Sequence, residues 1–382
     1  MKDGVTQRGS TWSYVIRVAD ADGRTRPRWV GGFRTEEEAK GARDLARVAA
    51  RRGIYVDRSN LKVCDYLDGW LTAHAVSLKP KSASGYRFII DNCINPRIGR
   101  QKLQGLRPSR VSSLYSELLT TGSKSGGPLS ARTVHGVHRV LHRAMADAVN
   151  DDRIPVSPVD RARAPRVVQV EHVDPWTPAE LSDFLMTAAK HRLGVFYRVA
   201  AYTGARRGEV LALEWKDIDL DHGLITISKS TSVIGRVRVT GTPKGGRART
   251  IGIDAGTITA LRRHLERQTT ELGVESTLVF TQADGSPVSP DTVTQLVPKL
   301  CTFAMVRRVR LHDLRHLHAT WLLTAGQPVH EVARRLGHRD AVVTLSTYAH
   351  IVGGRDSVLA DVFAEAAVSK SVSKSAGSLR AV

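Results

Sequence analysis

Proline interrupts this chain near its middle. Residues 152–175, DRIPVSPVDRARAPRVVQVEHVDP, contain four prolines and repeated arginines. Neither a helix nor a central strand continues through such a segment, because proline lacks an amide hydrogen and has a fixed φ. We therefore predict an extended basic linker over residues 156–174. Because 382 residues also suit two or three domains, we predict a multidomain protein, mainly α with small β-sheets.

Residues 1–57 predict a small domain made of a sheet and one helix. TWSYVIRVAD and RPRWVGGF have strand character, and an Asp-Gly turn lies between them. The next segment, TEEEAKGARDLARVAARRG, predicts a helix with Thr35 as its N-cap and Gly53 at its end. The aromatic residues are expected in the core: Trp12, Tyr14, Trp29 and Phe33. The interleaved arginines are expected on the open face of the sheet, which can enter a DNA groove: Arg17, Arg24, Arg26 and Arg28.

Residues 61–155 predict a helical domain that ends with SARTVHGVHRVLHRAMADAVNDD. Four apolar residues of this last helix form one stripe: Val134, Val137, Leu141 and Ala144. Five basic residues lie away from the stripe: His135, His138, Arg139, His142 and Arg143. Two interpretations stay open, a solvated surface and a helix laid against DNA. In the linker, Arg161 and Arg163 are expected to cross a phosphate backbone.

Residues 175–366 predict a third domain of mixed α and β structure. Its first helix has Thr177 as N-cap, Pro178 in the first position and Glu180 completing a capping box. LITISKS and RVRVTGTPKGGRARTIGID predict strands with a glycine-rich hairpin tip, and helices follow from Ala255. The polar residues 367–382 predict a disordered tail.

The net charge of the chain is +20 and its pI is about 10.3, which favours a polyanionic partner such as double-stranded DNA. The alternative is a merely basic surface without such a partner. Three scattered cysteines fit neither a disulfide framework nor a zinc cluster. No signal sequence or apolar run of membrane length is evident, so we expect a cytoplasmic protein with no membrane partner.

Six residues of the third domain are suited to a single reaction, the attack on a phosphodiester. They are Arg206, Lys244, His312, Arg315, His338 and Tyr348. Such an attack gathers negative charge on the non-bridging oxygens, which two guanidinium groups neutralise well. A tyrosine oxygen is a usable nucleophile once its proton is removed. A lysine suits protonation of the departing 5′ oxygen, and histidines accept protons or donate to phosphate. This chemistry requires no metal and no other cofactor.

The order and spacing of these residues resemble the motifs of the tyrosine recombinase, or phage integrase, family. The matching motifs are T-G-x-R-x-x-E at 203–209, the lysine at 244, H-x-x-R at 312–315, L-G-H at 336–338 and the tyrosine at 348. Residues 61–155 resemble the helical core-binding domain of this family, with Ser157-Pro158 where many members have Asn-Pro. Residues 1–57 resemble the small domain with which many integrases bind arm-type DNA sites.

The resemblance implies a site-specific recombinase that integrates and excises a mobile element. Arg206 and Arg315 would hold the scissile phosphate, and Lys244 would protonate the leaving 5′-hydroxyl. His312 would help to deprotonate Tyr348, and His338 would bond a phosphate oxygen. Tyr348 would form a 3′-phosphotyrosine bond, while Glu209 would orient an arginine or the backbone.

The resemblance also implies a tetramer on DNA, with DNA-bending and directionality proteins as further partners. An amphipathic helix at residues 351–366 would be donated to a neighbouring protomer through Val358, Leu359, Val362 and Phe363. The alternative is that this helix packs on its own domain.

Some of these residues also fit other roles. His312 and His316 have the spacing of a zinc helix, but Arg315 and the absence of an evident third ligand disfavour a metal. We expect His316 and His318 to be packing or supporting residues, each with one hydrogen bond. Arg247 and Arg249 are alternatives to Lys244 as the general acid.

The rival functions are a chromosome- or plasmid-resolving recombinase, a type IB topoisomerase and a catalytically silent DNA-binding regulator. A metal-dependent nuclease is disfavoured, because carboxylates do not cluster.

Overall fold

The computed structural model separates the chain into two units, residues 1–171 and 172–382, which are considered one at a time. It describes residues 4–19, 24–168, 175–235, 237–243, 245–338, 340–342, 344–345 and 348. The chain is mostly helical with small antiparallel sheets, as predicted. No helix among these residues is long and apolar enough to cross a membrane.

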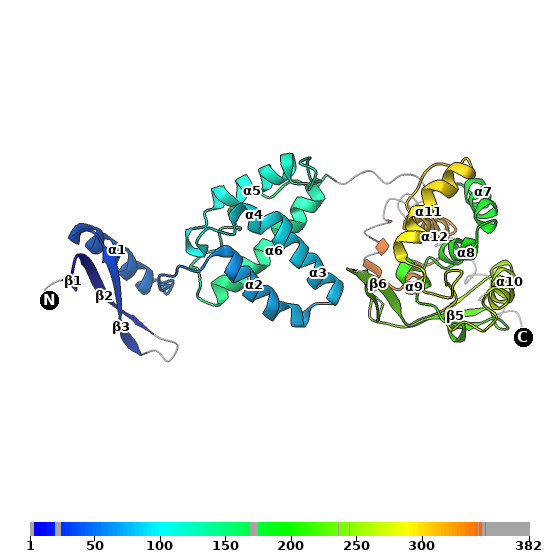
Figure 1. Cartoon of the computed structure of the whole chain (residues 1–382), viewed down its shortest axis with the longest axis horizontal. Coiled ribbons are helices and arrows are strands. Elements are labelled where there is room, and N and C mark those ends of the chain that lie inside the picture. The colour runs from blue at the N-terminus through cyan, green and yellow to red at the C-terminus, as the bar shows by residue number, and fades with distance from the viewer. Residues whose placement is uncertain are drawn as a thin grey trace, which may run out of the picture. The chain divides into compact units, whose positions relative to one another are not determined.

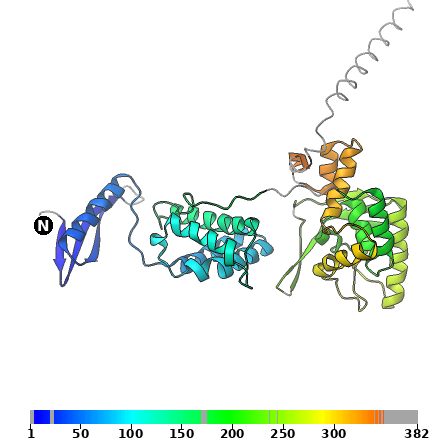
Figure 2. The same ribbon diagram turned by 90° about the horizontal axis from the view of Figure 1, so that it is seen from above.

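The chain begins with a three-stranded antiparallel sheet in the order β1-β2-β3, and one helix covers one of its faces (Figures 1 and 2). The elements are β1 (Val5–Arg8), β2 (Thr11–Ala19), β3 (Thr25–Phe33) and α1 (Glu36–Arg51). The strand β1 was not predicted. As predicted, Thr35 caps the helix, because its hydroxyl accepts a hydrogen bond from the Glu38 amide at 3.2 Å.

The strand register corrects two expectations about this sheet. Ile16 pairs with Arg28 and Val18 with Arg26, and directly paired residues share a face. Because Ile16 and Val18 pack toward α1, the expectation that Arg26 and Arg28 lie on the open face is wrong. Each strand alone indicates which residues alternate, but only the pairing register decides which arginines share a face with the core.

The open face instead carries Arg17 and a contacting pair, Arg8 and Trp29. Trp29 pairs with Val15 and is 43% exposed, so the expectation of a core position is wrong for this aromatic residue. The Arg8 guanidinium lies 4.3 Å from the centre of its ring, a cation–π contact. Tyr14 is buried in the core as predicted. Arg24 immediately precedes β3 and is exposed.

Residues 63–150 of the first unit are mainly helical (Figure 1). The α-helices of this range are α2 (Val63–His74), α3 (Pro80–Ile89), α4 (Asn95–Ile98), α5 (Pro108–Thr121) and α6 (Ala131–Asn150). The predicted apolar stripe of α6 is fully buried in the core that these helices form: Val134, Val137, Leu141 and Ala144. Burial of this stripe fixes the helix so that its basic side faces outward.

The first part of the proline-rich segment packs on the helical core. Val159 is fully buried there, and the Arg163 amide donates to the Ser112 hydroxyl of α5 at 3.1 Å. Ser157 is buried too, and its hydroxyl accepts from the Val159 amide. Up to Arg163, therefore, this segment is bound to the helical core, contrary to the prediction of a linker that begins at residue 156.

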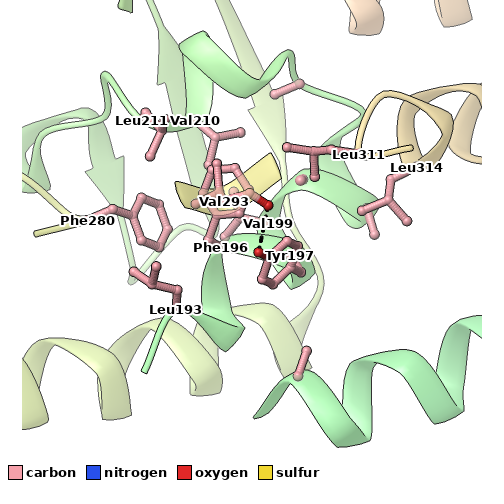
Figure 3. Packing of buried hydrophobic residues seen from close by; sticks show 14 of the residues in the cluster. Leu193, Phe196, Tyr197, Val199, Val210, Leu211, Phe280, Val293, Leu311 and Leu314 are labelled. Carbon is pink, nitrogen blue, oxygen red and sulfur yellow. Dashed lines mark hydrogen bonds between the residues drawn. The ribbon is translucent and has the colours of Figure 1, made fainter. Parts of the chain in front are cut away.

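The second unit combines helices with short strands. Its helices are α7 (Pro178–Ala189), α8 (Gly194–Thr203), α9 (Arg207–Val210), α10 (Ala255–Leu272), α11 (Pro290–Phe303), α12 (Asp313–Thr324) and α13 (Val329–Leu336). The helix α7 begins with the predicted capping box of Thr177 and Glu180. The helix α8 runs through the core, where the Tyr197 hydroxyl donates to the Val293 carbonyl of α11 at 2.8 Å (Figure 3).

The strands of this unit form two separate sheets. The strands are β4 (Ile218–Asp219), β5 (Leu224–Ile227), β6 (Ser230–Ile234), β7 (Val237–Gly241) and β8 (Arg249–Gly252). The first sheet has the order β4-β5-β8, and β6 pairs with β7 in the second.

This topology corrects the expected place of the TPKGG segment. It lies in the connection between β7 and β8, not at a hairpin tip, because β8 pairs with β5. The pairing places Ile225, Ile227 and Ile251 together in the core, which stabilises it. Lys244 itself lies outside the described residues, as do the expected helix at 351–366 and the tail at 367–382.

Candidate active site

A glycine with a left-handed conformation brings Arg206 to its position. Gly204 ends α8 with a φ of 64°, and Arg206 is the N-cap residue of α9. A Cβ atom on Gly204 would lie 2.7 Å from a methyl carbon of Leu336 and 2.9 Å from the ring of His318. The glycine is therefore required both for the turn and for the close approach of α12 and α13.

A buried carboxylate orients Arg206, as the sequence predicted for Glu209. Glu209 is 1% exposed and accepts hydrogen bonds from the Arg206 amide at 3.0 Å and from Arg206 Nη1 at 2.9 Å. It also accepts from Arg249 Nη2 at 2.7 Å. Burial alone would raise the pKa of Glu209, but the hydrogen bonds and charges of Arg249 and Arg206 outweigh burial and lower it. Glu209 is therefore ionised and holds two arginines.

Arg315 lies in the first turn of α12 and is 3% exposed. Its Nη1 donates to the Gly204 carbonyl at 2.7 Å, but its Nη2 is buried and has no hydrogen-bond partner within the described residues. Burial, followed by the charge of Arg206, lowers the pKa of Arg315 to about 9. A buried cation with an unused donor is costly, and an anion bound here would relieve both costs.

His338 follows the left-handed Gly337 that ends α13. Its Nδ1 lies 2.6 Å from the Thr344 hydroxyl, which leaves Nε2 for another partner. The guanidinium of Arg206 lies 3.5 Å from the Gly337 carbonyl, so the first arginine and this histidine belong to one site. Burial, followed by the charges of Arg315 and Arg206, lowers the pKa of His338 to about 4. The imidazole is therefore neutral at neutral pH.

Tyr348 is 4% exposed and packs among apolar residues of α12 and α13. Its hydroxyl lies 2.7 Å from Nδ1 of His316. This contact differs from the expectation that His312 helps to deprotonate the tyrosine, whereas a hydrogen bond of His316 was expected in a packing or supporting role. Burial raises the pKa of Tyr348 to about 12, although Arg315 opposes the rise.

His312 stands beside His316, with the two rings nearly perpendicular and their centroids 5.0 Å apart. Burial, followed by the positive electrostatic effects of His316, Arg315 and Arg206, lowers the pKa of His312 to about 4. The spacing of four residues, which places both histidines on one face of α12, was the sequence signal for a role of His316. The sequence did not indicate which of the two histidines contacts Tyr348.

His318 is a half-buried packing residue, as expected, but it has a hydrogen bond to the Ala201 backbone in addition to one with a side chain. Its Nε2 accepts from Arg335 Nε at 3.0 Å, and Arg335 Nη2 donates to the carbonyls of Tyr202 and Gly252. Burial, then the charge of Arg335, lowers the pKa of His318 to about 4. Arg335, missed by the sequence analysis, thus ties α13 to α8, α12 and β8.

The two rivals of Lys244 have different surroundings. Arg249 is held by Glu209 and by the Arg335 carbonyl at 2.9 Å, and Arg247 is exposed. Next to Lys244, a Cβ atom on Gly245 would lie 3.0 Å from the Gly337 carbonyl, so this segment passes the turn before His338.

The site has an excess of positive charge that suits a phosphate. Three arginines surround one buried carboxylate: Arg206, Arg249 and Arg315 around Glu209. Within the described residues, no three histidine, cysteine or acidic side chains are grouped as ligands for a metal ion. The arrangement can bind an anion beside a buried tyrosine hydroxyl.

The basic face of α6 lies in the other unit and is more exposed. His135, His138 and His142 form a row with ring centroids 5.7 and 5.8 Å apart. His138 is half-buried, and its Nδ1 lies 3.0 Å from the Tyr115 hydroxyl. Burial, followed by the two neighbouring histidines, lowers its pKa.

The remaining candidates for DNA contact reach solvent. They are Arg139, His142, Arg143, Arg161 and Arg163. Two of them face acidic residues: His142 lies 3.5 Å from Asp160, and Arg143 lies 3.4 Å from Asp147.

Three family models match separate parts of the chain. Residues 177–353 match the phage integrase family, residues 5–44 an arm DNA-binding domain and residues 63–119 the N-terminal SAM-like domain of phage integrases. The first of these matches contains every residue of the candidate active site.

Known integrases are similar over most of the chain. The ICEBs1 integrase of Bacillus subtilis is 27% identical over 350 residues, which are 88% of this chain and 91% of the relative. A putative prophage phiRv2 integrase of Mycobacterium tuberculosis is 28% identical over 313 residues, 81% of this chain and 80% of the relative.

Solved structures share the fold. A Tn1549 transposon integrase in complex with transposon right end DNA has a TM-score of 0.68 and 21% identity, covering 80% of this chain and 99% of that one. A lambda integrase tetramer bound to a Holliday junction has a TM-score of 0.58 and 16% identity, covering 88% and 96%. This chain therefore belongs to the phage integrase family of tyrosine recombinases and is a DNA-cleaving and rejoining enzyme of that family.

Proposed function

We propose that this integrase inserts and excises a mobile element by site-specific recombination through a 3′-phosphotyrosine intermediate. The observation that carries the proposal is the buried guanidinium of Arg315, whose Nη2 has no hydrogen-bond partner within the described residues. Arg206 and the buried hydroxyl of Tyr348 belong to the same neighbourhood. A scissile phosphate fits there because it supplies the anion that the arginines lack and the phosphorus atom that the tyrosine attacks.

Each side chain then has one role. Arg206 and Arg315 neutralise the non-bridging oxygens as charge develops on them, and Glu209 keeps Arg206 in position. His338 donates a hydrogen bond to the phosphate through Nε2, because Nδ1 is engaged with Thr344. Tyr348 is the nucleophile, and Lys244 is the general acid for the leaving 5′ oxygen. The energy of the broken bond is kept in the tyrosyl ester, so rejoining needs no ATP.

The first unit supplies surfaces for holding the duplex. We assign DNA contacts to the exposed side of α6 through Arg139, His142 and Arg143, and to the following segment through Arg161 and Arg163. In the N-terminal sheet the open face presents Arg8 and Arg17, while Arg24, Arg26 and Arg28 are exposed near β3. Phosphate contacts of this kind position a protein on DNA without specifying sequence.

Recombination of two duplexes requires four cleavage events, and we propose that four copies of the chain assemble on DNA. The lambda integrase structure is a tetramer bound to a Holliday junction, which supports this stoichiometry. We expect DNA-bending and directionality proteins as further partners and the nucleoid of a bacterial host as the place of action. The match to an arm DNA-binding domain favours an integrase over a chromosome-resolving recombinase.

Covalent trapping tests the proposal. Wild type and Tyr348→Phe are incubated without metal with nicked duplexes that contain candidate attachment sites, and protein-linked DNA is detected on denaturing gels. We expect a band in wild type only, with the link at a 3′ phosphate. Salt-sensitive duplex binding with no covalent product on any substrate would instead indicate a catalytically silent DNA-binding regulator.

A further inference from the structure

We propose that His316, and not His312 of the H-x-x-R motif, accepts the proton from the Tyr348 hydroxyl. This inference rests on the proposed function, because it concerns the same cleavage step. Its basis is the distance of 2.7 Å between His316 Nδ1 and Tyr348 Oη. A general base must lie within hydrogen-bond reach of the proton that it removes, and this nitrogen does.

The tyrosine needs such a base. Tyr348 is almost completely buried, and burial raises its pKa to about 12 despite the opposing effect of Arg315. At neutral pH very little of the hydroxyl is ionised, so attack on phosphorus requires transfer of the proton to a neighbouring group. Near the hydroxyl, a neutral imidazole is the suitable acceptor, because Arg315 stays charged.

His312 makes no hydrogen bond to Tyr348 in the described part of the chain; its ring stands perpendicular to that of His316. The arginines that face the phosphate, Arg315 and Arg206, act on His312 electrostatically. The two histidines, which lie on one face of α12, therefore have different roles. His316 serves the nucleophile, and His312, which is affected by the charges of Arg315 and Arg206, is left to donate to the phosphate.

The proton balance of the step is simple. The lone pair on His316 Nδ1 takes the Tyr348 proton while Oη bonds to phosphorus and the bond from phosphorus to the 5′ oxygen breaks. Lys244 supplies the proton to that oxygen. His316 must carry its own hydrogen on Nε2 before the step, and it becomes an imidazolium. On rejoining, Lys244, now neutral, takes the proton of the incoming 5′-hydroxyl as its oxygen bonds to phosphorus. The bond from phosphorus to Oη breaks, and the imidazolium returns its proton to the tyrosine oxygen.

Several ionisable groups lie around His316, so the pH dependence of cleavage reports more than one group. On α12 these are His312, Asp313 and Arg315, and from the segments packed against it come His338 and Tyr348. Asp313 is itself bonded to Arg310. The test therefore compares pH profiles between variants and does not rely on one absolute value.

The first variant is His316→Asn, whose amide oxygen can replace Nδ1 as a hydrogen-bond acceptor but cannot take up a proton. We expect single-turnover cleavage to fall about a hundredfold or more, with unchanged duplex affinity and melting temperature. The remaining rate should rise about tenfold per pH unit, because it depends on spontaneous ionisation of the tyrosine, while the wild-type rate levels off. His316→Gln serves as a second variant. His312→Asn is the matched control, and its cleavage rate should depend on pH in the same way as that of wild type.

A substrate with sulfur in place of the bridging 5′ oxygen separates the base from the acid, because a thiolate leaves without protonation. The loss in His316→Asn should persist on this substrate, whereas the loss in Lys244→Ala should largely disappear. Wild-type rates in His316→Asn, or rescue of this variant by sulfur, would overturn the inference alone. A wild type that forms no covalent product on any site would overturn the proposed function and this inference together.

Discussion

The outward face of α6 and the arginine cluster around Glu209 carry the same kind of charge in opposite surroundings. Arg139 and Arg143 reach solvent, and Arg143 is near one local acid, Asp147. Arg249 and Arg315 are mostly buried, and both belong to a network built from segments far apart in the chain. Exposed charges can be moved cheaply, whereas a buried charge is costly unless its partners are in place. The first region suits adjustable DNA contact, and the second suits a reaction that needs fixed geometry.

Replacement of Arg315 should give the largest effect. In Arg315→Lys, the single compact ammonium cannot both bond the Gly204 carbonyl and neutralise a phosphate oxygen. We expect the single-turnover cleavage rate to fall by about 10²- to 10³-fold with little change in duplex affinity. Arg207→Lys is the control, because Arg207 contacts Pro290 and Thr294 on α11. Comparable rates in both variants would contradict the distinction between the two arginines.

The next largest effect concerns stability. Glu209→Gln removes the negative charge that Arg206 and Arg249 share, and the free energy of unfolding should fall by about 3 to 5 kcal/mol. Because the pKa of Glu209 is depressed in the folded state, its contribution is present above its ordinary pKa and is lost as the pH falls. Urea denaturation measures the change. Asp160→Asn, at an exposed pair with His142, should cost less than about 1 kcal/mol, and an equal cost would remove the contrast.

Acid should then destabilise the second unit through histidines whose surroundings disfavour protonation, such as His318. The folded-state pKa of His318 is about 4, below the ordinary 6.5, so the folded state resists protonation. The free energy of unfolding is therefore unaffected by His318 above about pH 6.5, and it decreases as the pH falls from there toward 4. Melting temperatures between pH 7 and 4.5 should drop less in His318→Gln, whose amide oxygen can still accept from Arg335. His142→Gln is the exposed control, and a similar flattening there would contradict the role of burial.

The smallest expected effect comes from the surface. Arg139→Ala with Arg143→Ala should weaken duplex binding modestly and reduce the slope of log affinity against log salt by up to about 1.8. Fluorescence anisotropy at several salt concentrations measures this slope. Cleavage at saturating DNA should stay at the wild-type rate. An unchanged slope would favour the other interpretation of this face, a solvated surface without DNA contact.

Local patterns in the sequence were enough for much of the fold. The Thr35 cap, the capping box of Thr177 and Glu180, and the apolar stripe of α6 follow from interactions within a few residues of each other, and the structure confirms them. The motifs around Arg206, Arg315 and Tyr348 also indicated the family, because their residue types and order are legible without any fold. These features depend on helix periodicity, capping chemistry and the chemistry of single side chains.

Contacts between distant segments could not be read in the same way. The pairing of β2 with β3 decides that Arg26 and Arg28 share a face with the core, and the pairing of β8 with β5 moves the TPKGG segment out of a hairpin tip. A shift of one residue in such a register reverses every face, so the two strands must be seen together. The same holds for the choice between His312 and His316. Helical spacing made them neighbours on α12, but only the packing of Tyr348 against α12 and α13 decided which imidazole meets its hydroxyl.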